Sequence, residues 1–492
     1  MPGLMGLFRD LAPVASQPSW RRYAVSPERW MAAASGLQVE QWSLLGLWGD
    51  DAAVHMALYD AADAAVAIVS LDCPDGSFPS VARVFAPAAR LERTIRDLYE
   101  LEPVGALDTR PWLDHGRVGE GAALPYPFLA AEGESLHQIP VGPVHAGIIE
   151  PGHFRFTASG ETIVRLEERL GYVHKGTESL MVGAEIERGA LLAGRVSGDS
   201  TVAYALAFAR AVESACNVVA PPRAIWLRAL MAELERLANH FGDIGAVCND
   251  AAFAAMHAHC GALREEVLRA AESCFGHRLM MDRVVPGGVA VDLVAEGAAR
   301  LARLPDHLRR RFPELVRVYD NSSSLQDRMV GTGTLTAELA RRFAAGGFVG
   351  RASGRDFDAR RDTAYAPYDV LRFQIPVRQE GDVNARVWLR VEEIEQSLAL
   401  IEQILHGLPD GKVRMDIAPP AGHAEGVALV ESFRGDVLVW LRLEGGRIAR
   451  CHLRDPSWFQ WPLLEAVVEG NIVADFPLCN KSFNCSYSGH DL

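Results

Sequence analysis

The chain has 492 residues, of which 49% are apolar and 23% are charged, and its formal net charge at pH 7 is -14. This balance is typical of a globular protein, and the length indicates two or three domains because one apolar core rarely serves so long a chain. The negative charge excludes a general nucleic-acid binder, which carries a basic surface.

No stretch approaches the ~20 apolar residues that cross a bilayer, and the N-terminus, MPGLMGLFRDLAPVA, lacks the charged segment and cleavage site of a signal peptide. We therefore expect no membrane span and no signal peptide in the sequence. If the protein works at a membrane, we expect a partner to hold it there.

The first 115 residues are predicted to form a small mixed α/β domain. Val66–Leu71 has the composition of a strand, and Pro87–Leu101 is predicted to be an amphipathic helix. The apolar face of that helix consists of Leu91, Ile95, Leu98 and Leu101. Residues 116–136 are rich in glycine and proline and are predicted to be a linker.

Residues 137–492 are predicted to form a larger, mainly helical domain with antiparallel hairpins at its flanks. Gly152–Val173 is predicted to be one hairpin, and Val427–Ile448, with Gly445 and Gly446 at its turn, a second. Amphipathic helices are predicted over Ala224–Leu237, Ala251–Cys274, Glu296–Arg311 and Val391–Leu405. The C-terminal residues, NKSFNCSYSGHDL, are predicted to be polar and turn-like. The fold class is therefore α+β.

The eight cysteines include no C-x-x-C pair and are expected to be reduced thiols. One group of thiols and imidazoles suggests zinc. That group is Cys248, His257, His259, Cys260, Cys274 and His277. Because His257 and His259 are two residues apart, they face apart on a helix. We favour a core stripe of Phe253, Met256 and Cys260, and no zinc. The sequence also lacks a P-loop, a G-x-S-x-G and an H-E-x-x-H motif.

Two blocks near the domain boundary carry recognisable motifs. FAPAARLERTIRDLYELEPVGALDTRPWLDH, from Phe85 to His115, contains an E-R-x-x-x-D-L stretch, with Glu100 where a glycine follows in the signature. It resembles the signature end of the 30-kDa subunit of complex I. HQIPVGPVHAGIIEPGHFRF contains Gly142, Pro143 and His145, with Ala146 where the pattern has proline. It resembles the G-P-x-H-P stretch of the complex I 49-kDa subunit.

Five further blocks follow in order: GYVHKGTESL (171–180), ELERLANHFGDIG (233–245), RVVPGGV (283–289), RASGRDFDARRDTAYAPYD (351–369) and VESFRGDVLVWL (430–441). Each resembles a motif of the hydrogenase-like large subunits. The chain is therefore identified as resembling the hydrogenase-4 and formate hydrogenlyase-type large subunits, in which 30-kDa-like and 49-kDa-like parts are fused. The resemblance implies the α+β fold above and a place in a membrane-attached oxidoreductase complex.

In the nickel–iron members of this family, two C-x-x-C pairs hold the metals, since thiolates suit soft ions. The stretch that matches the first pair is GRVSGDST, so Ser197 and Ser200 stand at the two ligand positions. Near the C-terminus Cys479 and Cys485 are six residues apart and form no such pair. We therefore expect no nickel–iron centre and no hydrogen chemistry.

Complex I has a quinone pocket at the same place, so the resemblance implies a cavity for a quinone-like acceptor. On the first hairpin His145 and His153 are the candidate acceptor-binding residues. The second loop offers no tyrosine for the acceptor, because Gly198 or Asp199 stands there. The resemblance therefore implies a cavity but does not identify its ligand.

The candidate catalytic residues are His145, His174, Glu178, Arg195, Asp358, Arg361 and Asp362. His174 and Glu178 are either a solvated pair at a helix start or an acid and a base lining the cavity. Arg195 is expected to be buried and paired with Asp199 or Asp358. The Asp358, Arg360, Arg361 and Asp362 cluster is either a salt-bridged loop or, as the resemblance implies, part of a proton route.

The chain is expected to bind no cofactor itself, and no G-x-G-x-x-G follows a strand to hold NAD. The resemblance implies partners: an iron–sulfur small subunit like the 20-kDa subunit of complex I, a ferredoxin-like cluster subunit and antiporter-like membrane subunits. It also implies that the protein lies on the cytoplasmic side of the membrane and that it couples electron transfer to ion translocation. The alternative is a redox-inactive scaffold, which the loss of metal ligands favours and the retained ionisable residues disfavour.

Overall fold

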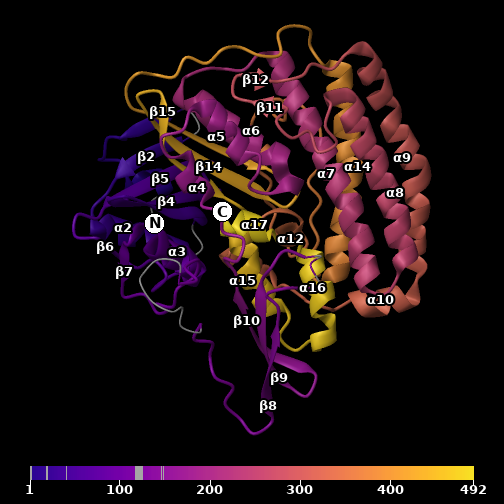
Figure 1. Ribbon diagram of the computed structural model, residues 1–492, viewed down its shortest axis with the longest axis horizontal. Coiled ribbons are helices and arrows are strands. Elements are labelled where there is room, and N and C mark those ends of the chain that lie inside the picture. The colour runs from indigo at the N-terminus through magenta and orange to yellow at the C-terminus, as the bar shows by residue number, and fades with distance from the viewer. Residues whose placement is uncertain (1–2, 18–19, 40–41, 117–125, 146, 148) are drawn as a thin grey trace.

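The computed structural model describes residues 3–17, 20–39, 42–116, 126–145, 147 and 149–492 (Figure 1). Its N-terminal part is built on a sheet of order β1-β2-β5-β4-β3, in which only β2 and β5 run parallel. The strands are β1 (Ala15–Gln17), β2 (Trp20–Ala24), β3 (Ser43–Asp50), β4 (Ala53–Asp60) and β5 (Ala65–Asp72). The strand predicted over Val66–Leu71 is confirmed as β5.

Helices α1 (Leu4–Leu7), α2 (Pro27–Gln38) and α3 (Ala89–Tyr99), a 3-10 turn η1 (Ala86–Ala88) and a parallel pair, β6 (Ser77–Pro79) and β7 (Glu102–Val104), complete this part. The predicted helix over Pro87–Leu101 is confirmed as η1 and α3. The helix ends at Glu100, whose φ of 55° is left-handed. Glycine adopts this conformation without a steric penalty, which explains why a glycine suits this position in the signature.

Four long helices form a bundle: α7 (Pro222–Asp250), α8 (Ala254–Phe275), α9 (Ala295–Asn321) and α14 (Val383–Gly407) (Figure 1). All four predicted helices are confirmed, but three extend well beyond their predicted bounds. In α7, polar residues such as His240 and Asp243 interrupt the apolar pattern and yet are buried, because each has a charged partner. In α9, Pro313 lies inside the helix rather than ending it.

The hairpin predicted over Gly152–Val173 is confirmed as β9 (His153–Ser159) and β10 (Thr162–Arg169), to which β8 (Leu136–Val141) adds a third strand. The second predicted hairpin is part of an antiparallel sheet of β13 (Ala424–Glu431), β14 (Asp436–Glu444) and β15 (Arg447–Arg454). Gly445 and Gly446, both with positive φ, form the turn between β14 and β15.

The prediction that the C-terminal residues are turn-like is wrong. The end of the chain folds into α15 (Ser457–Val467), η3 (Val473–Asp475), α16 (Phe476–Phe483) and α17 (Tyr487–Asp491). His490 and Asp491 are fully buried. The polarity of these residues suggests exposure, but Asp491 accepts hydrogen bonds from the Gly171 and Val173 amides at 2.9 and 3.0 Å. Its burial therefore leaves no polar group unsatisfied.

Shorter elements connect these units. They are α4 (Thr177–Met181), α5 (Ile186–Ala193), η2 (Gly198–Ser200), α6 (Thr201–Ala215), β11 (Val284–Val285), β12 (Gly288–Val289), α10 (Ser323–Met329), α11 (Ala337–Arg342), α12 (Gly347–Arg351) and α13 (Ala359–Asp362). In the described part of the chain no helix is long and apolar enough to cross a bilayer.

The N-terminal sheet packs face to face against the β13–β15 sheet. Trp20, Trp48 and Ile68 from one sheet form an apolar cluster with Leu438 and Trp440 from the other. The Trp48 and Trp440 ring centroids are 5.7 Å apart. Burial on both faces explains why β3 and β4 are apolar along almost their whole length.

The division into residues 1–115, a linker over 116–136 and residues 137–492 stays a prediction, and positions 117–125 of the linker lie outside the described residues. The structure shows that the two parts share apolar cores. Besides the cluster between the sheets, a second cluster joins α2 and α3 to Phe154, Phe348 and Trp461 of the larger part. The parts therefore pack on each other over an extensive apolar surface.

Candidate functional site

A cavity of about 340 Å³ lies where three distant segments of the chain meet. Ser197, Gly198 and Asp199 come from the loop between α5 and α6, and Ile149 and Glu150 from the loop that leads into β9. The C-terminal segment supplies Pro477, Asn480, Lys481, Asn484, Cys485, Ser486, Tyr487 and Ser488, and Asp250 and Arg434 complete the wall. The loop at positions 197–200 is the one whose sequence matches the first metal-binding motif.

The serine hydroxyls at this place bond to their neighbours. Ser197 Oγ donates to Asp199 Oδ1 at 2.7 Å and lies 3.0 Å from Ser486 Oγ, so residues 289 positions apart in the sequence are in contact. Ser486 Oγ also accepts from the Gly489 amide at 2.9 Å and so caps α17. The hydroxyls therefore fasten the C-terminal segment to the loop before α6.

Arg434, from the turn between β13 and β14, holds the same two segments together. Its side chain is only 2% exposed, and its Nη2 donates to Asp199 Oδ2 at 2.6 Å. It also donates to Ser200 Oγ at 3.1 Å and to the Asn484 carbonyl at 2.5 Å. Despite burial, the Arg434 guanidinium lowers the pKa of the Asp199 carboxyl, so this group stays ionised.

These donors do not fit a nickel–iron centre. Cys485 is the one thiol among the residues that line the cavity. Burial raises the pKa of Cys485 well above its usual value and that of Cys479 to about 12, which opposes thiolate formation at either residue. Within the described residues no group of three or more His, Cys, Asp and Glu side chains is placed to hold a metal ion. The absence of a nickel–iron centre stays a prediction for metal analysis.

The two histidines predicted to bind an acceptor lie at the base of the hairpin loop and are not part of the cavity wall. His145 is half-buried, and its Nε2–H donates to the Gly152 carbonyl at 2.7 Å. His153 Nδ1–H donates to the Gly142 carbonyl at 3.2 Å, and burial lowers its pKa. A neutral His145 therefore offers only Nδ1, an acceptor, to a ligand. Ala146, at the expected proline position, lies outside the described residues.

His174 and Glu178 do not form an acid–base pair. His174 Nδ1–H donates to the Asp491 carbonyl at 2.7 Å, which anchors the end of the chain. Glu178 is buried between α4 and β15, where its carboxylate accepts from His452 Nδ1 at 2.9 Å and pairs with Arg450 at 2.8 Å. Against the effect of burial, Arg450 and His452 lower the pKa of Glu178 to about 2. Neither residue lines the cavity, so any part in catalysis would be indirect.

The expected burial and partners of Arg195 are wrong. Its side chain is 44% exposed, and it pairs with Asp282 at 2.5 Å rather than with Asp199 or Asp358. Leu192 and Ala193 at the end of α5 are buried, while Arg195 comes after the helix end and turns outward. Arg195 stays a predicted catalytic residue, and the structure places it at the surface.

The Asp358–Asp362 cluster divides into a buried and an exposed half. Asp358 and Arg360 are buried and paired at 2.7 Å, and Arg360 also pairs with Glu233 of α7 at 3.0 Å. Arg361, whose side chain is 42% exposed, pairs with Asp362 at 2.9 Å and with Asp356 at the surface. Only the first half belongs to the charge network of the interior, and Arg360 was not among the predicted catalytic residues.

The buried half continues into a network between α7 and α14. Glu393 of α14 accepts from Arg351 at 2.7 Å and from His240 at 2.7 Å. Arg351 also pairs with Asp358 and Glu431. Burial raises the pKa of Glu431, and the nearby Asp358 carboxylate acts in the same direction, so this carboxyl takes up a proton more readily than a free glutamate.

Hydrogen bonds also connect the cavity wall to the bundle. Asn484 Nδ2 donates to Asp243 Oδ1 at 2.9 Å, and Asp243 Oδ2 pairs with Arg390 Nε at 3.1 Å. Below the loop, Glu235 accepts from the Val202 and Ala203 amides at 2.7 and 3.1 Å. Burial nevertheless raises the pKa of Glu235 to about 8. A carboxyl that is protonated at neutral pH thus lies directly beneath the cavity loop.

Sequence reasoning missed Arg434, Ser486 and Lys481 as site residues. Arg434 lies in the block VESFRGDVLVWL, which resembles a family motif. The R-G pair at the turn of that block is the signal that could have identified it. Ser486 and Lys481 have no comparable signal, since both lie in the polar C-terminal stretch.

Comparison with known proteins gives matches over most of the chain. Residues 250–422 match the family model described as the 49-kDa subunit of respiratory-chain NADH dehydrogenase. The chain is 31% identical over 448 residues to formate hydrogenlyase subunit 5 of Escherichia coli strain K12, a match that covers 86% of this chain and 78% of the relative.

Two further relatives match shorter stretches of the chain. Carbon monoxide-induced hydrogenase of Rhodospirillum rubrum is 32% identical over 355 residues, which is 71% of this chain and 98% of the relative. An NADH-quinone oxidoreductase subunit of Roseiflexus sp. strain RS-1 is 33% identical over 354 residues, or 69% and 94% of the two chains. Among solved structures, a chain of the archaeal membrane-bound sulfane sulfur reductase matches with a TM-score of 0.69 and 25% identity, covering 74% of this chain and 100% of that one.

Proposed function

Because this chain belongs to the family of large subunits that complex I shares with the formate hydrogenlyase-type hydrogenases, we propose that it couples electron transfer to ion translocation without hydrogen chemistry. The chain is a subunit of an oxidoreductase complex of this kind. An iron–sulfur subunit would deliver electrons to an acceptor in the cavity, and membrane subunits would respond to the proton uptake and charge change that follow.

The cavity at Ser197–Asp199 is the observation that carries this proposal. It lies at the loop that matches the first metal-binding motif, and its wall offers hydroxyls, amides, three carboxylates, an ammonium group, a guanidinium and one protonated thiol in place of four thiolates. Soft metals bind such oxygen and nitrogen donors poorly. A polar organic acceptor, which needs hydrogen bonds and protons, suits this wall better.

For a quinone-like acceptor, the donors at hand are Lys481, Asn480 and Ser488, all in the cavity wall. Such a group, when bound, would accept two electrons and two protons. The chain's own contribution would be to orient it and to hold protons nearby. Glu235 beneath the loop and Glu431 further along the network, whose pKa values burial raises, are suited to hold those protons.

The partners follow from the family. We infer an iron–sulfur subunit like the 20-kDa subunit of complex I, a ferredoxin-like cluster subunit and antiporter-like membrane subunits, with the chain on the cytoplasmic side of the membrane. We also infer that residues 1–115 correspond to the 30-kDa subunit of complex I. The match to formate hydrogenlyase subunit 5 covers 86% of this chain, which exceeds the share that residues 137–492 make up, and so supports a fused arrangement.

A redox-inactive scaffold is the second candidate. One observation favours it. The polar side chains at the junction form hydrogen bonds and an ion pair with one another, as a purely structural junction between segments would require; they are Ser197, Asp199, Arg434 and Ser486. The two candidates differ in what they expect of Asp199. In the scaffold its charge serves only to hold Arg434, whereas in the proposed function it also sets the electrostatics of the cavity.

The test uses Asp199→Asn in the purified complex, because asparagine keeps the shape and removes the charge. We expect subunit content to remain as in the wild type and turnover with a reduced donor to fall at least ~10-fold, as a loss of ~1.4 kcal/mol in transition-state stabilisation would give. Asp292→Asn is the control, since Asp292 forms an exposed ion pair with Arg223 far along the sequence. Unchanged turnover and ion uptake in an intact Asp199→Asn complex would favour the scaffold.

A further inference from the structure

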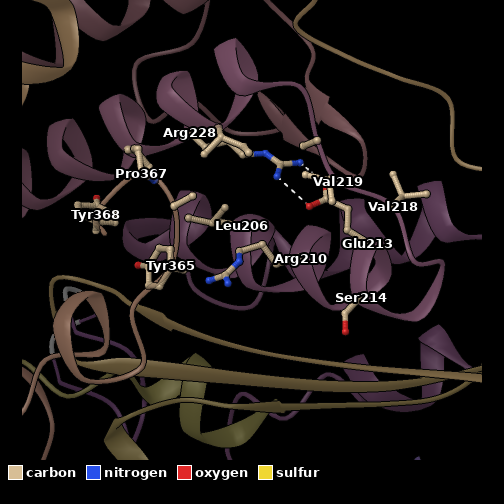
Figure 2. A pocket seen from close by; sticks show the side chains of 14 residues that line it. Leu206, Arg210, Glu213, Ser214, Val218, Val219, Arg228, Tyr365, Pro367 and Tyr368 are labelled. Atoms are coloured by element: carbon tan, nitrogen blue, oxygen red, sulfur yellow. Dashed lines mark hydrogen bonds and ion pairs between the residues drawn. The ribbon is translucent and has the colours of Figure 1, made fainter. Parts of the chain in front are cut away.

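A second cavity, of about 220 Å³, lies between α6, the start of α7 and the segment Tyr365–Tyr368 (Figure 2). It shares no lining residue with the cavity at Ser197–Asp199. The family motifs assign no role to it, although Tyr365 and Tyr368 belong to one of the matched blocks. Its wall contains two arginines and one carboxylate, so the charges do not balance.

The carboxylate of this cavity already has a partner. Both oxygens of Glu213 accept from Arg228, at 2.5 and 3.0 Å, and Oε1 also accepts from the Gly287 amide at 2.9 Å. Arg228 also donates from Nε to the Gly288 carbonyl and from Nη2 to the Val285 carbonyl. Figure 2 shows Glu213 turned toward Arg228 and away from Arg210. The Glu213–Arg228 ion pair therefore carries no net charge, and its carboxylate is fully engaged.

Arg210 carries the charge that is left over. Within the described residues its contacts are one hydrogen bond of 3.4 Å to the Leu429 carbonyl and the Tyr365 ring, whose centroid lies 4.2 Å from the guanidinium carbon. No carboxylate there lies within ion-pair distance of it, and Glu213 acts on it only from further away. Burial lowers its pKa, but a guanidinium stays charged at neutral pH. Most of its five N–H donors remain available to a ligand.

The hydroxyls of the two tyrosines do not compete for Arg210. Tyr368 donates to Glu233 at 2.7 Å, and Tyr365 accepts from the Glu431 amide at 3.2 Å. The rest of the wall is mostly apolar and consists of Leu206, Val218, Val219, Ala220, Ile225, Ala229 and Pro367. Val219 is 79% exposed and marks the side open to solvent.

We propose that this cavity binds a small organic carboxylate, which pairs with the Arg210 guanidinium and lays a short apolar chain against Val218 and Ile225. A carboxylate matches the planar fork of a guanidinium. A phosphate would need several convergent donors, and here one free cation faces an apolar wall. The volume lies below the ~300–1,000 Å³ of sites for larger ligands, so the ligand is a short-chain acid.

The test measures binding of butyrate to the full-length protein by calorimetry and by the shift in unfolding temperature. Butyramide, the neutral isostere, and inorganic phosphate are compared at equal concentration and ionic strength. We expect saturable binding of butyrate and none of the other two. Arg210→Gln should weaken butyrate binding roughly tenfold or more, as loss of a charge-assisted pair would. Arg303→Gln, the same change at an exposed position of α9, should leave it unchanged.

A second measurement does not depend on the folding of a variant. Crystals of the wild-type protein soaked in 4-bromobutyrate should show the bromine anomalous peak between α6 and Tyr365. Three outcomes would overturn the proposal: equal binding of phosphate, undiminished binding to a folded Arg210→Gln protein, or a bromine peak at other sites only.

Discussion

Glu178 Oε2 lies 2.8 Å from Arg450 Nη1, and this buried pair joins α4 to β15 beneath the N-terminal sheet. Tyr99 of α3 donates to the same carboxylate at 3.4 Å, so three parts of the chain meet at one charge. Arg450 in turn donates to the Gly49 carbonyl of β3. The carboxylate is thus part of the junction between the two halves of the protein.

This junction should weaken in acid. Because Arg450 and His452 lower the pKa of Glu178 to about 2, its stabilising effect is complete above the unfolded value of 4.5 and is lost as the pH falls toward 2. Glu178→Gln should be less stable than the wild type at pH 7, by on the order of 2–3 kcal/mol, and the difference should shrink below pH 4. Urea titrations at several pH values measure this. The exposed Glu187→Gln serves as control, and a difference independent of pH would contradict the assignment.

Glu235 should make the protein less stable as the pH rises, the opposite of the effect of Glu178. Its pKa is raised to about 8, so the folded state binds a proton more tightly than the unfolded state, and stability should fall as the pH rises from about 4.5 to about 8. Glu235→Gln keeps an acceptor for the Val202 and Ala203 amides and should flatten this part of the profile. In the wild type this loss of unfolding free energy between pH 4.5 and pH 8 should be on the order of 3 kcal/mol. The measurement is the unfolding free energy at pH 5 and pH 8 for the wild type, Glu235→Gln and the exposed control Glu272→Gln. An equal change with pH in all three proteins would contradict the role assigned to Glu235.

His145 should matter for turnover and not for assembly of the complex. Its Nε2–H holds the Gly152 carbonyl at 2.7 Å, and this bond positions the loop that supplies Ile149 and Glu150 to the cavity. His145→Ala should lower turnover several-fold, about 1 kcal/mol, while the subunits stay associated. His137→Ala, at an exposed position of β8, is the matched control.

His145→Gln separates two explanations of that loss. An amide can donate to the Gly152 carbonyl but cannot exchange a proton near neutral pH. Recovery of turnover in His145→Gln would assign the residue a positioning role, and continued loss a role in proton exchange. Full activity of an intact His145→Ala complex would rule out both.

The purified protein should contain no stoichiometric nickel. Ser197 and Ser200 bond to Asp199 and Arg434, and the single lining thiol is held protonated by its burial. Metal analysis of protein grown with added nickel is the measurement. About one nickel per chain would overturn this prediction and would require ligands outside those described.

Cleavage between Gly116 and Gly133 should leave the two parts associated. The Gly/Pro-rich composition makes this stretch a natural protease site. The fragments should still elute together on size exclusion, because the Trp48–Trp440 cluster and the Arg22–Glu425 pair at 2.5 Å join the two sheets. Separate elution without denaturant would show that the shared core is too weak to hold them.

The sequence by itself determined the local elements and the family. Helices α3, α7, α8, α9 and α14 and strands β5, β9 and β10 follow from apolar periodicity, because that pattern depends on neighbours a few residues away. The ordered motif blocks identified the family, and the serines at positions 197 and 200 are enough to predict the loss of metal ligands.

Only the tertiary structure decided what surrounds those serines. Asp199 and Arg434 are 235 residues apart, and Ser197 and Ser486 are 289 apart, so no periodicity connects them. The same holds for Arg195, whose partner Asp282 is 87 residues away. The C-terminal residues are too polar to suggest burial, and they are buried because distant amides and carbonyls satisfy them. A polar residue's place depends on such partners, which only the folded chain brings within reach.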